Sequence, residues 1–101
     1  MDATRYTDFE QLVRMLNDAE IVPIVSGGFA LEILSGYDLD SKIAPLIIED
    51  DFLDDEPLID SIMRAAKFER LDVPELVYSN FDNTLSVAYM PQSAVEPLIG
   101  H

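Results

Sequence analysis

The sequence predicts a single α/β domain spanning residues 1–101, in which helices pack on a small mixed β-sheet. Three observations predict this fold class. A short apolar run at residues 21–25 leads through a Gly-Gly turn directly into an apolar helix. Apolar residues recur at helical spacing before and after that unit, and residues 85–90 alternate as a half-buried strand does. The expected order of elements is α-β-α-β-α-β-β.

Composition and charge narrow the class of protein. The 101 residues are 49% apolar, enough for one buried core. Twenty acidic residues face six basic ones, and the net charge of −14 disfavours nucleic acid and anionic membranes as partners. Cysteine is absent, which excludes disulfides and cysteine metal sites. With no apolar leader segment and no apolar run near the ~20 residues of a membrane span, we expect a cytoplasmic protein, and its oligomeric state stays open.

The first third of the chain predicts a helix and then a strand. Thr7 and Glu10 have the spacing of a capping box, so the helix is expected to begin at Thr7 and end near residues 17–20. The strand at residues 21–25 is apolar throughout, which indicates burial on both faces. Pro23 cannot donate to a ladder and therefore indicates an edge position or a break.

The second third centres on a turn at residues 26–28 and a helix at 29–35 that Gly36 ends. A polar loop follows, and residues 43–48 form the second strand. The apolar residues expected on the buried side of the helix are Phe29, Ala30, Ile33 and Leu34.

The last third predicts a helix and several strands. The helix is expected over residues 56–68, with Asp54 or Asp55 as its cap and Pro57 in its first turn. Short strands are expected at residues 71–73, 76–79 and 85–90, and a terminal helix at residues 92–99.

Several chemistries are excluded by residue type. The only histidine is His101, so no Cys–His pair and no Ser–His–Asp triad exists within the chain. Neither the P-loop nor the dinucleotide-binding glycine pattern is present. Carboxylates are the plentiful reactive groups, so any catalysis would use a divalent cation with oxygen ligands, with Mg²⁺ favoured.

The strand, the Gly-Gly turn and the helix that starts Phe-Ala-Leu resemble the first motif of the nucleotidyltransferase superfamily related to DNA polymerase β. Within the superfamily, the sequence most resembles the small bacterial antitoxin-type and antibiotic-modifying members. The resemblance covers about residues 21–68. In that family the turn brings backbone N–H groups close to nucleotide phosphates. The resemblance therefore implies ligand binding by Ser26, Gly27 and Gly28. The alternative is an ordinary tight turn that lets strand and helix pack closely.

The family's second motif is a pair of carboxylates two residues apart on the next strand, where they share metal ions. Asp38 and Asp40 have this spacing in an expected loop, and they would be the Mg²⁺ ligands of an active nucleotidyltransferase. If the strand at 43–48 sets the register, the pair falls near Ile43 and Pro45, and both carboxylates are missing. We favour this second alignment, because apolar strand residues anchor register better than a loop does.

The sequence thus predicts a degenerate member of this family, a non-catalytic binding or regulatory protein without a cofactor. The family's third carboxylate would fall within residues 85–90, which contain none. An active Mg²⁺-dependent nucleotidyltransferase using Asp38 and Asp40 is the alternative.

A further hypothesis concerns the most acidic stretch, residues 49–56. It lacks the glycine and the ligand spacing of an EF-hand loop, and we expect a solvated turn whose charges stabilise the next helix. The alternative is an interaction surface for a basic protein partner, or a DNA mimic. Its carboxylates are those of Glu49, Asp50, Asp51, Asp54, Asp55 and Glu56.

Overall fold

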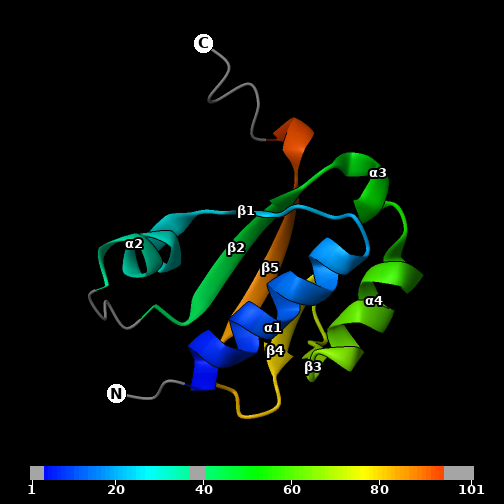
Figure 1. The fold of residues 1–101 in the computed structure, drawn as a ribbon. Helices are drawn as coiled ribbons and strands as arrows, with labels where there is room; N and C mark the ends of the chain where they lie inside the picture. The colour runs from blue at the N-terminus through cyan, green and yellow to red at the C-terminus, as the bar shows by residue number, and fades with distance from the viewer. Residues whose placement is uncertain (1–3, 37–40, 95–101) are drawn as a thin grey trace.

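The computed structural model describes residues 4–36 and 41–94, and it confirms the mixed α/β fold (Figure 1). A five-stranded sheet has the order β1-β2-β5-β4-β3, in which β2 and β5 are parallel and the other neighbours antiparallel. The elements are α1 (Thr4–Asp18), β1 (Ile24–Val25), α2 (Gly27–Ser35), β2 (Ile43–Ile48), α3 (Asp50–Leu53), α4 (Glu56–Ala65), β3 (Phe68–Arg70), β4 (Val77–Asn80) and β5 (Ser86–Pro91).

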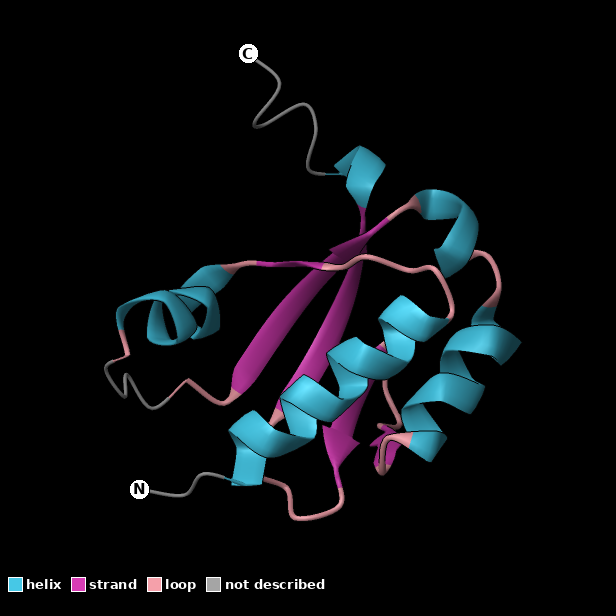
Figure 2. Cartoon of the chain, in the orientation of Figure 1, coloured by secondary structure: helices cyan, strands magenta, loops and turns pink. Residues whose placement is uncertain are grey.

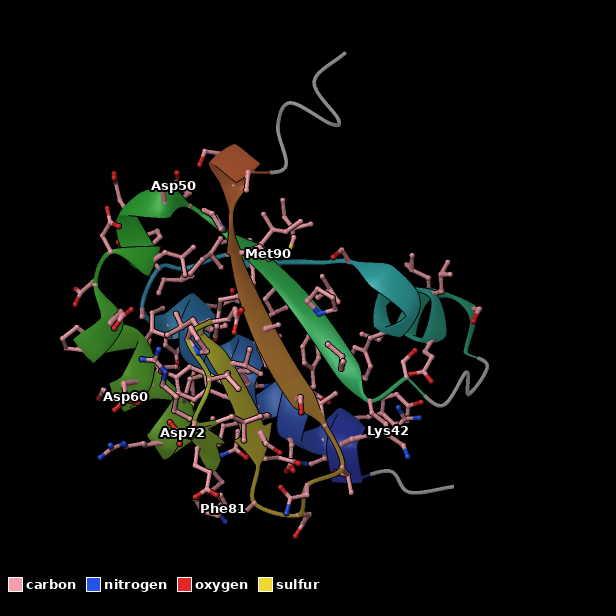
Figure 3. The ribbon with its side chains drawn as sticks, turned by 180° about the vertical axis from the view of Figure 1, so that it is seen from behind. Lys42, Asp50, Asp60, Asp72, Phe81 and Met90 are labelled. Carbon is pink, nitrogen blue, oxygen red and sulfur yellow. The ribbon has the colours of Figure 1, made fainter. Side chains whose placement is uncertain are left out.

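The core lies between one face of the sheet and the helices α1 and α4, which run side by side in front of the strands (Figure 2). Alternate residues of the central strands point into it, so that Ala44, Leu46 and Val87 are fully buried. Seen from behind, β2 and β5 lie in front of α1, and α2 lies to one side beyond the edge of the sheet (Figure 3). Helix α2 therefore lies outside the layer that α1 and α4 form.

Helix α1 begins earlier than its capping signal predicts. It starts at Thr4, so Thr7 lies inside the helix and the prediction of a capping box at Thr7 and Glu10 is wrong. The Glu10 carboxylate instead accepts a hydrogen bond from Arg14 at 2.6 Å, one turn further along. Tertiary contacts explain the extension, because Arg5 is buried against α2 and the Tyr6 ring stacks on Phe29 at 5.8 Å.

The first strand is shorter and more exposed than predicted. Only Ile24 and Val25 pair with β2, and the expectation of burial on both faces is wrong, because Val22 is 78% exposed and Ile24 53%. The cause is position: β1 is an edge strand with β2 as its one neighbour in the sheet. The edge position inferred from Pro23 is thereby confirmed.

Helix α2 buries a different face from the one predicted. Phe29 is buried as expected, but Ile33 is 48% exposed and Leu34 is 84% exposed. The charged residue Glu32 is buried in their place, at 2% exposure. Gly36 has a left-handed φ of 76°, and its N–H bonds to the Glu32 carbonyl, so the predicted helix end is confirmed.

The helix α4 ends three residues before the predicted boundary, at Ala65. Lys67 has a φ of 68°, which ends the helix and turns Phe68 into β3. The predicted strand at residues 71–73 is therefore wrong, and the strand that pairs with β4 lies at Phe68–Arg70. The other two late strands and Asp55 as the helix cap are confirmed, with small shifts of boundary.

The acidic stretch is not a plain turn, because it contains the short helix α3. Phe52 and Leu53 within it pack partly buried against the core. Residues 92–94, which follow the carboxyl end of β5 close to α3, are helical, and the rest of the predicted terminal helix lies outside the described residues. Within residues 4–36 and 41–94, none of the helices has the length and apolar character to cross a bilayer.

Candidate functional site

The Gly-Gly turn forms the start of α2 and lies against the first half of β2. The backbone N–H of Ser26 donates to the Pro45 carbonyl at 3.1 Å, which continues the β1–β2 pairing up to the turn. Ser26 has extended backbone angles at the N-cap, and its side chain makes no capping hydrogen bond. Gly27 then adopts a φ of 72° before the helix begins. The turn thus presents the amino-terminal end of a nine-residue helix beside a strand.

Backbone conformation accounts for Gly27, and a neighbouring side chain lies close to Gly28. A left-handed φ is strained for any residue with a Cβ, which explains Gly27. A Cβ on Gly28 would lie 2.6 Å from the Ser41 Oγ, closer than such atoms approach. A Cβ on Gly27 would lie 3.5 Å from the Pro45 Cγ, which shows how near the strand is. These features fit a tight turn, and ligand binding by Ser26, Gly27 and Gly28 stays a prediction.

The strand positions beside the turn carry hydrocarbon side chains. Ile43 and Pro45 alternate with the buried Ala44 and Leu46, so they share the face of β2 that points away from the core. The register places Ser86 opposite Ile43 and Ala88 opposite Pro45 on the parallel strand β5. The four side chains that this face presents next to the turn therefore include no carboxylate.

The alternative metal ligands, Asp38 and Asp40, lie outside the described residues. Their direction relative to the Gly27–Gly28 turn therefore stays a prediction. Across residues 4–36 and 41–94, no three His, Cys, Asp or Glu side chains come together as a group that could hold a metal ion.

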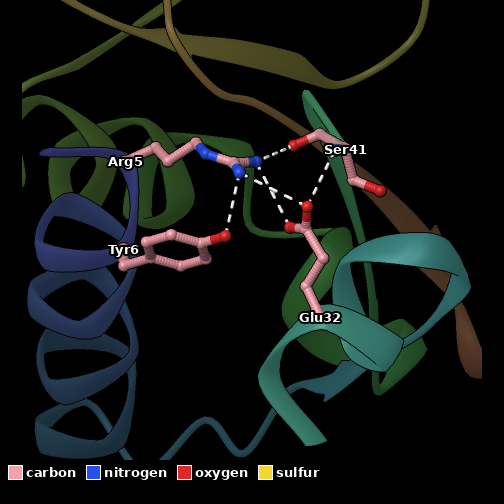
Figure 4. A network of polar contacts seen from close by, with 4 residues as sticks. All are labelled: Arg5, Tyr6, Glu32 and Ser41. Atoms are coloured by element: carbon pink, nitrogen blue, oxygen red, sulfur yellow. Dashed lines mark hydrogen bonds and ion pairs between the residues drawn. The ribbon is translucent and has the colours of Figure 1, made fainter. Parts of the chain in front are cut away.

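A buried ion pair joins α1 to α2 and to the start of β2 (Figure 4). The Arg5 Nη1 lies 3.2 Å from the Glu32 Oε2, and both side chains are almost fully buried. The Ser41 N–H donates to the Glu32 Oε1 at 2.9 Å, and Arg5 donates to the Ser41 carbonyl and, at 2.8 Å, to the Tyr6 hydroxyl. Each charge thus has several partners, as a buried ion pair requires. The network fixes α2 against α1 with the charged end of Glu32 pointing inward.

A groove of about 540 Å³ lies between α1 and α2, beside this network. This volume is within the range of small-molecule sites. Its walls are mostly apolar, and its charged groups include the Glu10–Arg14 pair of α1 and Glu32. The residues that line it are Tyr6, Phe9, Glu10, Val13, Arg14, Glu32, Ile33 and Gly36.

Sequence reasoning missed both the ion pair and the groove. Each depends on how α1 and α2 are placed, and Arg5 and Glu32 are 27 positions apart. One signal was present in the sequence. Glu32 is the single charged residue between residues 21 and 36, and a lone charge within an apolar helix indicates a specific partner.

The predicted acidic interaction residues are distributed around α3 and the start of α4. Asp55 caps α4 by accepting from the Leu58 N–H at 3.3 Å, and Glu56 lies 3.5 Å from Arg70. The Asp50 carboxylate accepts from the Ser93 N–H at 3.1 Å, and hydrogen bonds from Ser93 hold the pKa of Asp50 below its ordinary value. Several of these carboxylates therefore have structural partners, as expected for charges at helix starts.

Comparison with known proteins gives no relative. No family model matches the chain, and neither a curated protein nor a solved structure matches it.

Proposed function

We propose that this chain is a non-catalytic binding protein whose scaffold is similar to a nucleotidyltransferase core. The proposal places the protein in the cytoplasm and requires no cofactor. Its binding site is the groove between α1 and α2, which takes a small, largely apolar molecule.

The observation that carries the proposal is the chemistry of the strand beside the turn. An enzyme of this family needs two carboxylates there, and the chain has Ile43 and Pro45 at the positions whose side chains share that face. The matching positions of β5 hold Ser86 and Ala88. Hydrocarbon and hydroxyl groups supply neither the charge nor the ligand count for Mg²⁺.

The groove supports the binding half of the proposal. Its volume of about 540 Å³ matches sites that enclose small ligands. Apolar walls from Phe9, Val13 and Ile33 would gain the free energy of burying apolar ligand surface. The buried ion pair behind it holds the two helices in place, so the groove is preformed.

Nucleotide-dependent heat stability separates this proposal from the enzyme alternative. Unfolding would be followed with each nucleoside triphosphate and MgCl₂, both at millimolar concentration. We expect no shift in Tm, whereas a bound nucleotide at about 100 times its Kd would add about 2.7 kcal/mol to stability. Mg²⁺-dependent stabilisation that disappears in Asp38→Ala/Asp40→Ala, but not in the matched surface variant Asp72→Ala/Asp82→Ala, would establish the enzyme instead.

The groove is tested with an uncharged apolar dye such as Nile red. We expect dye fluorescence to rise with the wild-type chain and to fall several-fold in Val13→Glu, which places a charge in the wall. Phe81→Glu is the matched control, because Phe81 is 60% exposed on a distant turn and the variant adds the same charge. Equal dye binding by both variants would rule the groove out.

A further inference from the structure

Among the described elements, no helix covers the face of the sheet that points away from the core. Helices α1 and α4 cover the opposite face, and from behind β2 and β5 lie foremost (Figure 3). Cross-strand partners point to the same side of a sheet, so the register defines what this face presents. Ile43 is 57% exposed on it and Met90 is 37% exposed. The apolar side chains of this surface, which we call the open face, are Ile24, Ile43, Pro45, Ile47, Ala88 and Met90.

The dimensions of the open face match one α-helix. The strands β2 and β5 each have a neighbouring strand on both sides, so a partner meets side chains there and not the unpaired backbone that an added strand needs. The three strands β1, β2 and β5 together span about 10 Å, which is about the diameter of a helix. The six residues of β2 extend over about 20 Å, the length of about 13 helical residues.

An acidic hollow of about 300 Å³ lies at one end of the open face. It forms where the carboxyl ends of the parallel strands β2 and β5 meet, next to Met90. Figure 3 shows Asp50 and Met90 at this end, and Lys42 at the other end of β2. The residues that line the hollow are Glu49, Asp50, Asp51, Gln92 and Ser93. The apolar surface thus leads into a hollow with three carboxylates.

The hollow suits the charged end of a lysine or arginine side chain. Across residues 4–36 and 41–94, no three carboxylates converge closely enough to hold a metal ion. An ammonium or guanidinium group reaches spread carboxylates through several N–H donors, so it needs no such convergence. Hydrogen bonds from Ser93 hold the pKa of Asp50 below its ordinary value, so this carboxylate is charged at neutral pH.

We propose that the open face binds an amphipathic α-helix of a partner protein, whose apolar side packs on Ile43 and Met90 and whose lysine or arginine enters the acidic hollow. Burial of the exposed hydrocarbon provides affinity, and the charge contact fixes the direction of the helix.

Charge selects this occupant over two others. A second copy of the chain, with its net charge of −14, would bring carboxylates against the carboxylates of the hollow. A neutral apolar helix would cover the open face but leave the hollow without a counter-charge. A basic amphipathic helix satisfies both surfaces at once.

Fluorescence anisotropy with a labelled model peptide tests the apolar contact. The probe has about 14 leucine and lysine residues, with the leucines at helical spacing on one side. We expect saturable binding that weakens at least tenfold in Ile43→Gln/Met90→Gln, which removes hydrocarbon without changing the charge. Leu31→Gln/Leu34→Gln is the matched control, because both leucines are exposed on α2, and it should bind as the wild type does. No binding by the wild type, or equal binding by the two double variants, overturns the proposal.

Neutralising the hollow tests the charge contact without altering a strand. Glu49→Gln/Asp51→Asn should weaken binding of the lysine peptide several-fold, whereas Asp18→Asn/Asp54→Asn changes the net charge equally at exposed carboxylates outside the hollow and should have a smaller effect. The same peptide with glutamate in place of lysine should bind at least tenfold more weakly. Equal loss in the two charge variants would show attraction to the overall acidity alone, and it would overturn the proposed site.

Discussion

Helices α2 and α4 have nearly the same length and opposite designs. In α4 the apolar residues Ile59 and Met63 are buried, and the charged residues Glu56 and Arg64 are exposed. In α2 the charged residue is buried and the leucines face water. The contrast shows that α4 is held by apolar packing, as most helices are, whereas α2 combines one buried aromatic ring, Phe29, with a specific buried ion pair.

The largest expected effect comes from breaking the anchor of α2. Arg5→Ala leaves the Glu32 carboxylate buried without its cation, and removal of one partner of a buried pair costs about 3–5 kcal/mol. Urea unfolding measures this loss. Arg14→Ala is the control, because its pair with Glu10 is exposed, and it should cost less than about 1 kcal/mol. Similar losses in both variants would show that the buried pair is not what holds α2.

Removing both charges sharpens this test. Replacement of a buried ion pair by apolar residues is often neutral, so Arg5→Met/Glu32→Leu should recover at least half of the stability that Arg5→Ala loses. Part of the loss remains, because the Ser41 N–H loses its acceptor. A double variant less stable than Arg5→Ala would contradict the explanation.

Matched truncations compare the two helices directly. Met63→Ala removes a fully buried side chain of α4 and should cost about 2–5 kcal/mol. Leu34→Ala removes a mostly exposed side chain of α2 and should change the free energy of unfolding by less than about 0.5 kcal/mol in dilute protein. Chemical denaturation of both variants at one protein concentration provides the comparison. A large loss in Leu34→Ala would mean that α2 packs outward in the monomer.

Substitution of the N-cap residue should also cost more stability in α4 than in α2. Asp55 accepts from the Leu58 N–H at the start of α4, and its replacement by Ala should cost about 1 kcal/mol. Ser26 makes no such bond at the start of α2, so Ser26→Ala should be close to neutral. Thermal unfolding of the two variants would distinguish them, and equal Tm values would contradict the difference in capping.

The smallest effect is a dependence on high pH. Burial, with the nearby Asp60 carboxylate of α4, raises the pKa of Tyr78 from 10.0 to about 12. The unfolded chain then loses this proton before the folded chain does, so stability falls as pH rises from about 10 to 12. Tyr78→Phe should lose less stability than the wild type over that range, measured by urea unfolding. If the stability of the wild type and of Tyr78→Phe falls equally over this pH range, the ionisation of Tyr78 is not the cause.

The parts of the fold that were predictable from the sequence follow local rules. The helical spacing of Ile59 and Met63 and the alternation of residues 85–90 each define a buried face without knowledge of the rest of the chain. The boundary between α4 and β3 was missed although the helical spacing of buried residues stops at Ala66, because Phe68 would lie on the side of a continued helix opposite Ile59. The left-handed Lys67 that separates them has no sequence signal comparable to a glycine.

The candidate site was predictable only in part, for a physical reason. The Gly-Gly turn is a local signal, and the structure shows a left-handed φ at Gly27, which favours glycine. The burial of Glu32 depends on Arg5, which local patterns do not connect to it. The helix was expected to bury Ile33 and Leu34, and instead Glu32 is buried in its ion pair with Arg5.

The position of β5 has a consequence for how the chain folds. It is the last described strand in the sequence, yet it lies in the middle of the sheet, between β2 and β4. Its parallel pairing with β2 joins residues roughly 40 positions apart, and such non-local contacts slow folding. Without β5 the sheet would consist of two separate antiparallel pairs, β1–β2 and β3–β4, with no strand between them. We therefore expect a cooperative, millisecond or slower transition in which the central strand arrives late.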